Sequence, residues 1–274
     1  MKGVFSVFRF YINASIHVAF AVLALFWITV LEFELEVPTA LWLFVFFGTI
    51  TGYNFVKYAK VAGLHHRSLA QSLRAIQVFS ALSFAVLFFS VFYLKINTLL
   101  VAIGFGLLTF FYAVPLLKRK NLRTLSGLKI MIVALVWAGV TIMVPVVEDG
   151  MPLTNDFFIA FLQRFLLVIV LTIPFEIRDL AFDRLKLQTL PQRLGVLKTK
   201  ILGAAFLVVI LVLEGFKDVF ATAQLYALIV LVLLCSIALM VSKKEQSRYF
   251  ASFWVESIPI AWLLSWCLFR HFLA

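Results

Sequence analysis

Residues 174–195 read PFEIRDLAFDRLKLQTLPQRLG and continue a long apolar run. Glu176, Asp179 and Asp183 stand at offsets of 0, +3 and +7, a spacing that places three carboxylates on one face of a helix. Negative charges gathered at the edge of an apolar medium require a cation between them. The stretch therefore predicts a site for a divalent ion or a phosphate-bearing ligand. The alternative is an acidic turn of a polar loop that is neutralised by its own basic residues, Arg178, Arg184 and Lys186.

The composition is that of a membrane protein. Hydrophobic residues make up 64% of the 274 residues, charged residues make up 14%, and the mean hydropathy is +1.08. A soluble domain needs more charge to cover its core, so these values exclude one. Apolar stretches of the length that crosses a bilayer lie near residues 10–31, 39–56, 75–94, 97–117, 128–147, 157–177, 200–215, 219–241 and 250–270. We therefore expect an all-α polytopic membrane protein with about nine transmembrane helices in one domain, residues 1–274.

The basic residues gather in the loops of one side. If the loops alternate across the membrane, all but four of the 24 Lys and Arg fall on that side, the exceptions being Lys95, Arg164, Lys217 and Arg270. The opposite loops are mainly acidic. The positive-inside rule predicts a cytoplasmic N-terminus and an external C-terminus in a cell membrane, with a bacterial inner membrane as the favoured case. The same distribution argues against nucleic acid as the reason for the net charge of +11.

Two junctions on the basic side suggest an internal duplication. The second predicted helix ends in GTITGYNFVKYAKVAGLHHRSL at residues 48–69, and the sixth ends in the acidic stretch four helices later. A tandem four-helix unit would give pseudo-repeats at roughly residues 1–125 and 126–242, with a ninth helix at 250–270. Such repeats bring equivalent junctions face to face across one cavity.

Two charged residues fall inside predicted helices. Arg164 lies in the sixth helix and Glu256 near the basic side of the ninth. Charges within a membrane are costly, so they usually face an interior cavity. The alternative is that each pairs with a neighbouring helix or extends to the interface.

Several motifs resemble those of the UbiA-type prenyltransferase superfamily. Glu176, Asp179 and Asp183 resemble its D-x-x-D-x-x-x-D run with one conservative change, and the TLPQRLG of residues 189–195 resembles the segment that follows it. The run Tyr112, Pro115 and Lys118 resembles the Tyr-x-x-Pro-x-x-Lys motif that ends the fourth helix. The resemblance spans nearly the whole chain and implies the helical bundle of that superfamily.

The resemblance also implies an activity. Superfamily members hold a polyprenyl diphosphate through Mg²⁺ and transfer its prenyl group to an aromatic or other lipid acceptor within the bilayer. On this chain, it assigns catalytic roles to Glu176, Asp179 and Asp183, and it makes these three and Asn54 the metal ligands. The residues expected to bind the diphosphate are Lys57, Lys60, Arg67, Lys118, Arg178 and Tyr112.

The chain departs from the superfamily at the first acidic motif. Where N-D-x-x-D is expected, residues 54–58 read Asn-Phe-Val-Lys-Tyr, so both aspartates are lost. Phe55 and Tyr58 cannot replace carboxylate ligands of Mg²⁺, whereas Lys57 and Lys60 can neutralise a phosphate directly. Two alternatives therefore stand beside the transferase. One is a non-catalytic isoprenoid-phosphate binder or carrier that keeps the fold. The other is an ion-coupled transporter, which fits less well because the carboxylates lie at the membrane edge.

Overall fold

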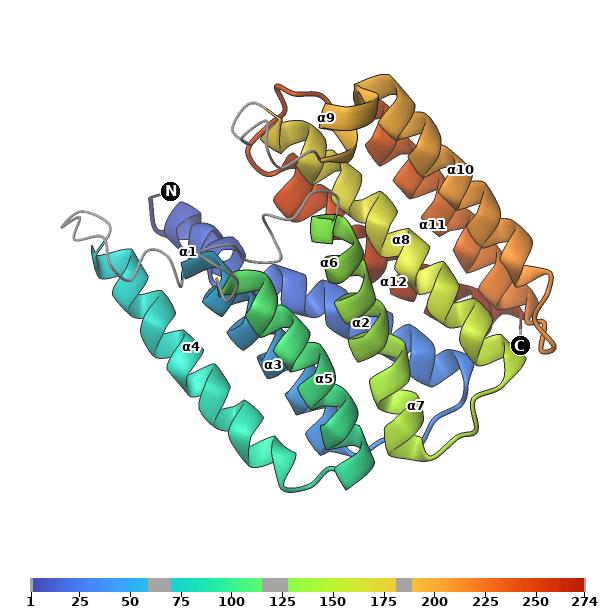
Figure 1. Ribbon diagram of the computed structural model, residues 1–274, viewed down its shortest axis with the longest axis horizontal. Helices are drawn as coiled ribbons and strands as arrows, with labels where there is room; N and C mark the ends of the chain where they lie inside the picture. The colour runs from blue at the N-terminus through green and yellow to red at the C-terminus, as the bar shows by residue number, and fades with distance from the viewer. Residues whose placement is uncertain (1, 59–69, 115–127, 181–188, 274) are drawn as a thin grey trace.

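The protein is a bundle of long helices (Figure 1). The computed structural model describes residues 2–58, 70–114, 128–180 and 189–273, and no strand occurs within these ranges. The α-helices are α1 (Lys2–Asn13), α2 (Ile16–Glu32), α3 (Thr39–Tyr58), α4 (Ala70–Val91), α5 (Ile96–Ala113), α6 (Leu128–Ala138), α7 (Val144–Asp149), α8 (Asn155–Asp179), α9 (Leu190–Leu194), α10 (Val196–Glu214), α11 (Thr222–Val241) and α12 (Ile258–Leu273). Two π-helical segments, η2 (Gly139–Met143) and η4 (Phe250–Val255), precede α7 and α12.

The described helices confirm the expected membrane architecture. Eight segments are long and apolar enough to cross a bilayer, and α1 with α2 makes a ninth if this pair, bent by 53°, is one span. Helices α6, η2 and α7 form the fifth span, and η4 with α12 forms the ninth. A side chain at Gly139 would collide with the ring of Phe105, so the glycine lets α5 pack against the start of η2.

The first span differs from the continuous helix expected at residues 10–31. Ser15 adopts a left-handed conformation with φ of 63°, which ends α1 and restarts the chain as α2. Such a conformation is uncommon for a residue with a side chain and needs support from its surroundings. The end of α3 gives that support. The Nδ2 of Asn54 donates to the carbonyl of Ala14 at 3.1 Å, and Tyr58 Oη donates to the carbonyl of Asn13 at 3.0 Å.

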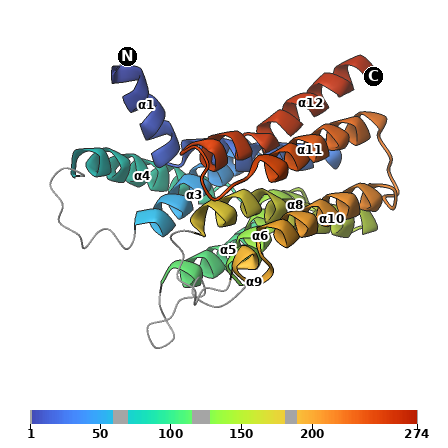
Figure 2. The ribbon, with the colours of Figure 1, turned by 90° about the horizontal axis from the view of Figure 1, so that it is seen from above.

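The helix ends form two groups that match the charge pattern. The N-terminus and the ends that flank residues 59–69, 115–127, 180–189 and 242–249 lie together, and we call this the basic end (Figure 1). The C-terminus and the connections at residues 33–38, 92–95, 150–154 and 215–221 lie opposite, at the acidic end. Seen from above, α5, α6, α8 and α10 lie on one side, and α4, α11 and α12 lie on the other (Figure 2). The alternation is as expected; which end faces the cytoplasm stays a prediction.

A buried ionic network closes the acidic end. The Nζ of Lys217 lies 2.6 Å from both Glu32 Oε1 and Glu214 Oε2. Gln224 donates to Glu32, and Gln163 donates to Glu214, each at 2.9 Å. Burial alone would lower the pKa of Lys217, but the carboxylates of Glu32 and Glu214 raise this pKa above its ordinary value. The network ties α2, α8, α10 and α11 together.

Arg164 stabilises the bundle just inside this end. Its guanidinium donates to the carbonyl of Leu25 at 2.6 Å and to Thr141 Oγ1 at 3.0 Å, and it lies over the ring of Trp262 with its carbon 5.4 Å from the ring centroid. Of the two roles expected for Arg164, pairing with neighbouring helices is therefore the one observed.

Candidate functional site

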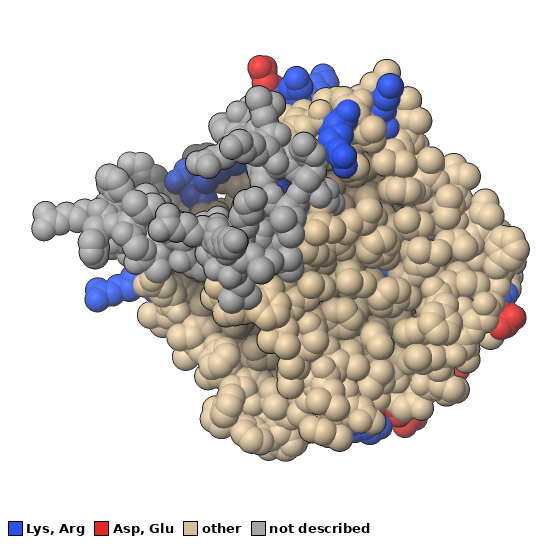
Figure 3. Space-filling view, viewed as in Figure 1, with Lys and Arg blue, Asp and Glu red and all other residues tan. Residues whose placement is uncertain are grey.

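Positive charge marks the basic end on the molecular surface. Lys and Arg gather there on the face shown in Figure 3, whereas the broad middle of that face is uncharged, as a lipid-facing belt should be. Exposed members of this group near α9 and the loop before η4 include Arg193, Lys198, Lys243 and Lys244. A negatively charged ligand would therefore be attracted to this end of the bundle.

The acidic stretch places two of its carboxylates in different surroundings. Glu176 is 2% exposed, and its Oε1 lies 2.8 Å from the Nζ of Lys129 on α6. Asp179, at the end of α8, accepts a hydrogen bond of 2.8 Å from the Nε of Arg178. Asp183 lies outside the described residues. Among the residues that are described, no three His, Cys, Asp or Glu side chains converge in a way that would hold a metal ion.

Asn54 has a structural position. It is buried, its Oδ1 accepts a hydrogen bond of 2.8 Å from Ser15 Oγ, and its Nδ2 donates to Ser80 Oγ at 2.8 Å as well as to Ala14. Both ends of the amide are therefore engaged in holding the break between α1 and α2 against α3 and α4. The Oδ1 expected to be a metal ligand already accepts this hydrogen bond from Ser15.

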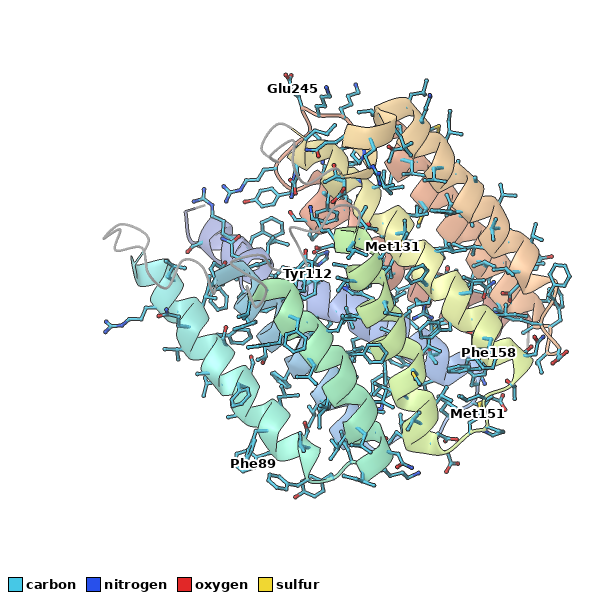
Figure 4. The ribbon with its side chains drawn as sticks, viewed as in Figure 1. Phe89, Tyr112, Met131, Met151, Phe158 and Glu245 are labelled. Carbon is cyan, nitrogen blue, oxygen red and sulfur yellow. The ribbon has the colours of Figure 1, made fainter. Side chains whose placement is uncertain are left out.

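Tyr53, four residues before Lys57 on α3, faces the neighbouring helix α6. The Oη of Tyr53 accepts a hydrogen bond of 2.9 Å from Trp137 Nε1 on α6. Tyr53 also interacts electrostatically with Tyr112 on α5 and with Glu256. Figure 4 shows Tyr112 near the middle of the basic end, where its own helix terminates. These contacts bring α3, α5, α6 and the start of the ninth span together.

Lys57 and Arg178 add positive charge to the same place. Lys57 donates to Ser15 Oγ at 2.9 Å, and both Lys57 and Arg178 interact electrostatically with Glu256. We call the group of Tyr53, Lys57, Tyr112, Trp137, Arg178 and Glu256 the inner cluster. It unites three residues expected to bind diphosphate, namely Lys57, Tyr112 and Arg178, with three that the resemblance does not assign. Lys60, Arg67 and Lys118 lie outside the described residues.

The side chains at the positions of the missing aspartates, Phe55 and Tyr58, lie on a different face of α3 from Tyr53. Phe55 stacks on Phe110 of α5 with ring centroids 6.0 Å apart and planes 11° from parallel. Phe55 and Tyr58 both line a groove of about 380 Å³ between α3 and α4. Residues two apart lie on nearly opposite faces of a helix, so Tyr53 and Phe55 cannot lie on the same face of α3. A carboxylate at position 55 or 58 would therefore enter the groove and not the inner cluster.

The segment that follows the acidic stretch becomes a short helix at the basic end. The side chain of Gln192 accepts a hydrogen bond of 3.1 Å from the backbone N–H of Thr189, which caps the start of α9. Gly195 then turns the chain into α10 with φ of 80°, a conformation that favours glycine. The TLPQRLG sequence thus encodes a capped turn between the acidic stretch and the next span.

Comparisons with solved structures identify the fold. A UbiA homolog from Archaeoglobus fulgidus, solved with GPP and Mg²⁺, superposes with a TM-score of 0.66 over 96% of this chain and 99% of that one, at 12% sequence identity. A digeranylgeranylglyceryl phosphate synthase matches with a TM-score of 0.58 over 98% of both chains, at 18% identity. No protein-family model and no curated protein matches the sequence. The chain therefore has the UbiA-type fold that its motifs led us to expect.

Proposed function

We propose that this chain is a membrane-embedded, prenyltransferase-like protein that binds a polyprenyl diphosphate at the basic end of its bundle. The inner cluster carries this proposal, since it places the cations of Lys57 and Arg178 inside a fold shared with a protein solved with GPP and Mg²⁺. Ammonium and guanidinium groups are the side chains that best pair with phosphate oxygens. The hydrophobic acceptor would approach from the bilayer.

The residues of the inner cluster suit the first step of a prenyl transfer. In that step the allylic C–O bond breaks, and its electron pair leaves with the diphosphate, whose charge Lys57 and Arg178 would neutralise. The aromatic rings of Tyr53, Tyr112 and Trp137 would lie beside the allylic cation and stabilise it through their faces. The acceptor then bonds to the prenyl carbon and loses a proton.

The described residues do not fit the full metal cage that the resemblance implies. Glu176 is neutralised by Lys129, and the Asn54 oxygen accepts from Ser15. In this proposal, Mg²⁺ would therefore bind to the two remaining carboxylates of the acidic stretch, Asp179 and Asp183. Such an ion would draw negative charge from the leaving diphosphate.

The same observation favours a second candidate function. A chain that lacks the first acidic motif and neutralises Glu176 internally is suited to bind an isoprenoid phosphate without turning it over. Pyrophosphate release from GPP, measured with candidate aromatic and lipid acceptors, separates the transferase from this carrier.

The metal part of the proposal is tested through the thermal stability of the full chain in lipid nanodiscs. GPP with Mg²⁺ should raise the melting temperature of the wild type, because a ligand stabilises only the state that binds it. Replacing Asp179 and Asp183 together by Ala should remove the Mg²⁺-dependent part of this shift. Glu245→Ala, at the margin of the basic end in Figure 4, is the matched control. Equal shifts in the wild type and the double variant would contradict a metal site at the acidic stretch.

A further inference from the structure

Glu256 is a carboxylate of the inner cluster to which neither the resemblance nor the proposed reaction gives a role. It follows η4, the π-helical segment that opens the ninth span. Within the described residues its carboxylate makes no hydrogen bond and no close ion pair, unlike Glu176 and Asp179, which each contact a cation at 2.8 Å. Such a residue inside a membrane protein usually serves a function.

Hydrogen bonds from α2 fix the position of Glu256 relative to Lys57. Ser15, at the break before α2, accepts from Lys57 Nζ at 2.9 Å. Two residues later, the Nε2 of His17 lies 3.0 Å from the carbonyl of Phe253 and 3.2 Å from Ser257 Oγ. The start of α2 therefore contacts both the end of α3 and the start of the ninth span. Glu256 precedes Ser257 directly and comes into electrostatic range of Lys57.

Charged and titratable groups face Glu256 from several elements. Lys57 and Tyr53 come from α3, Arg178 comes from α8, and Tyr11 comes from α1. His17 of α2 lies one residue away, at Ser257. The negative charge of Glu256 would stabilise both cations in the empty site. The same carboxylate would repel a diphosphate that binds to those cations.

We propose that Glu256 is the internal counter-ion of the phosphate site, and that it takes up a proton when a diphosphate binds between Lys57 and Arg178. This inference rests on the proposed function for its ligand. In the empty site the ionised carboxylate compensates Lys57 and Arg178. In the filled site the phosphate oxygens replace it, and the neutral acid no longer repels them.

The ligand arm of the test uses calorimetric titration of the full chain in nanodiscs with GPP and with inorganic pyrophosphate. Repeating each titration in two buffers of different ionisation heat counts the protons taken up. The wild type should take up about one proton more per bound ligand than Glu256→Gln, and the variant should bind about tenfold more tightly, within the usual range of coupling between neighbouring sites. Glu245→Gln, an exposed carboxylate at the same end, is the control.

A second arm needs no ligand. Glu256→Gln removes the carboxylate that compensates Lys57, so the melting temperature of the empty protein should fall, and adding Lys57→Met should recover part of the loss in a double-mutant cycle. Equal affinity and equal proton uptake in the wild type and Glu256→Gln would overturn the counter-ion role, and so would additive effects in the cycle. Absence of GPP and pyrophosphate binding in every variant, despite a coupled cycle, would refute the proposed ligand and leave the pairing of Glu256 with Lys57 established.

Discussion

At the scale of single residues, Asn54 and Glu176 show how a motif can persist in sequence while its side chains serve the fold. Asn54 makes hydrogen bonds to Ala14, Ser15 and Ser80. Glu176 is matched by Lys129 from a neighbouring helix. Buried polar groups are costly without partners, so both residues would be retained for stability in a protein that had lost catalysis. Their presence alone does not identify an enzyme.

Replacing Asn54 by Leu should therefore destabilise the protein without selectively removing the effect of Mg²⁺. The substitution leaves the Ala14 carbonyl and the Ser15 hydroxyl short of partners, at a cost of roughly 1–3 kcal/mol for each buried group. We expect a lower melting temperature with a preserved Mg²⁺-dependent shift by GPP. Gln77→Leu, at an exposed neighbour on α4, is the control. Unchanged stability together with loss of the Mg²⁺ effect would instead make Asn54 a metal ligand.

At the scale of elements, α3 shows what hydropathy can and cannot predict. Its span was evident from the apolar run at residues 39–56, and so were the other spans. The face that looks inward was not, because a helix that is apolar all round carries no amphipathic stripe. The break at Ser15 was also not predictable from the local sequence, because the hydrogen bond that supports it joins Ser15 to Asn54, 39 residues away. Tyr53 and Lys57, four residues apart, are the one local signal of that face.

A pair of double variants tests which face of α3 belongs to the site. Tyr53→Asp with Lys57→Asp would introduce carboxylates into the inner cluster and should raise the Mg²⁺ dependence of GPP binding. Phe55→Asp with Tyr58→Asp would place them in the groove between α3 and α4 and should leave that dependence unchanged. Titrations with and without Mg²⁺, on variants whose ligand-free melting temperatures are known, decide the matter. If only the Phe55→Asp, Tyr58→Asp variant gained Mg²⁺ dependence, positions 55 and 58 would face the functional site, as the superfamily motif implies.

At the scale of the whole molecule, the two ends of the bundle have different tasks. The basic end gathers the cations and aromatic rings of the inner cluster together with Glu176 and Asp179. The acidic end is closed by the network around Lys217 and by Arg164 one layer inside it. This division suits a protein that admits a charged ligand from one side only.

The closed end should be sensitive to the loss of Lys217. Lys217→Met leaves Glu32 and Glu214 without their cation, which typically costs roughly 3–5 kcal/mol for a buried pair. Because the pKa of Lys217 is raised above 10.5, its contribution is fully present below that value and is lost as the pH rises through the raised pKa. The wild-type melting temperature should show this fall only in alkali, and the variant should lack it. A variant as stable as Lys243→Met, at an exposed position of the opposite end, would contradict the role of the network.

The orientation of the bundle is the remaining whole-molecule prediction. Its charge asymmetry places the basic end in the cytoplasm, because positively charged loops are retained there during insertion. After replacement of Cys235 and Cys267 by Ala, single cysteines at Ser68 and Gln188 report on the connections after α3 and α8, and one at Val219, 71% exposed, reports on the acidic end. In intact bacterial cells an impermeant thiol reagent should label position 219 alone, and permeabilisation should expose the other two. Labelling of position 68 or 188 before permeabilisation would place the basic end outside. A phosphate ligand would then have to be sought on the outer face of the membrane, so the orientation also decides which pool of isoprenoid diphosphates could reach Lys57 and Arg178.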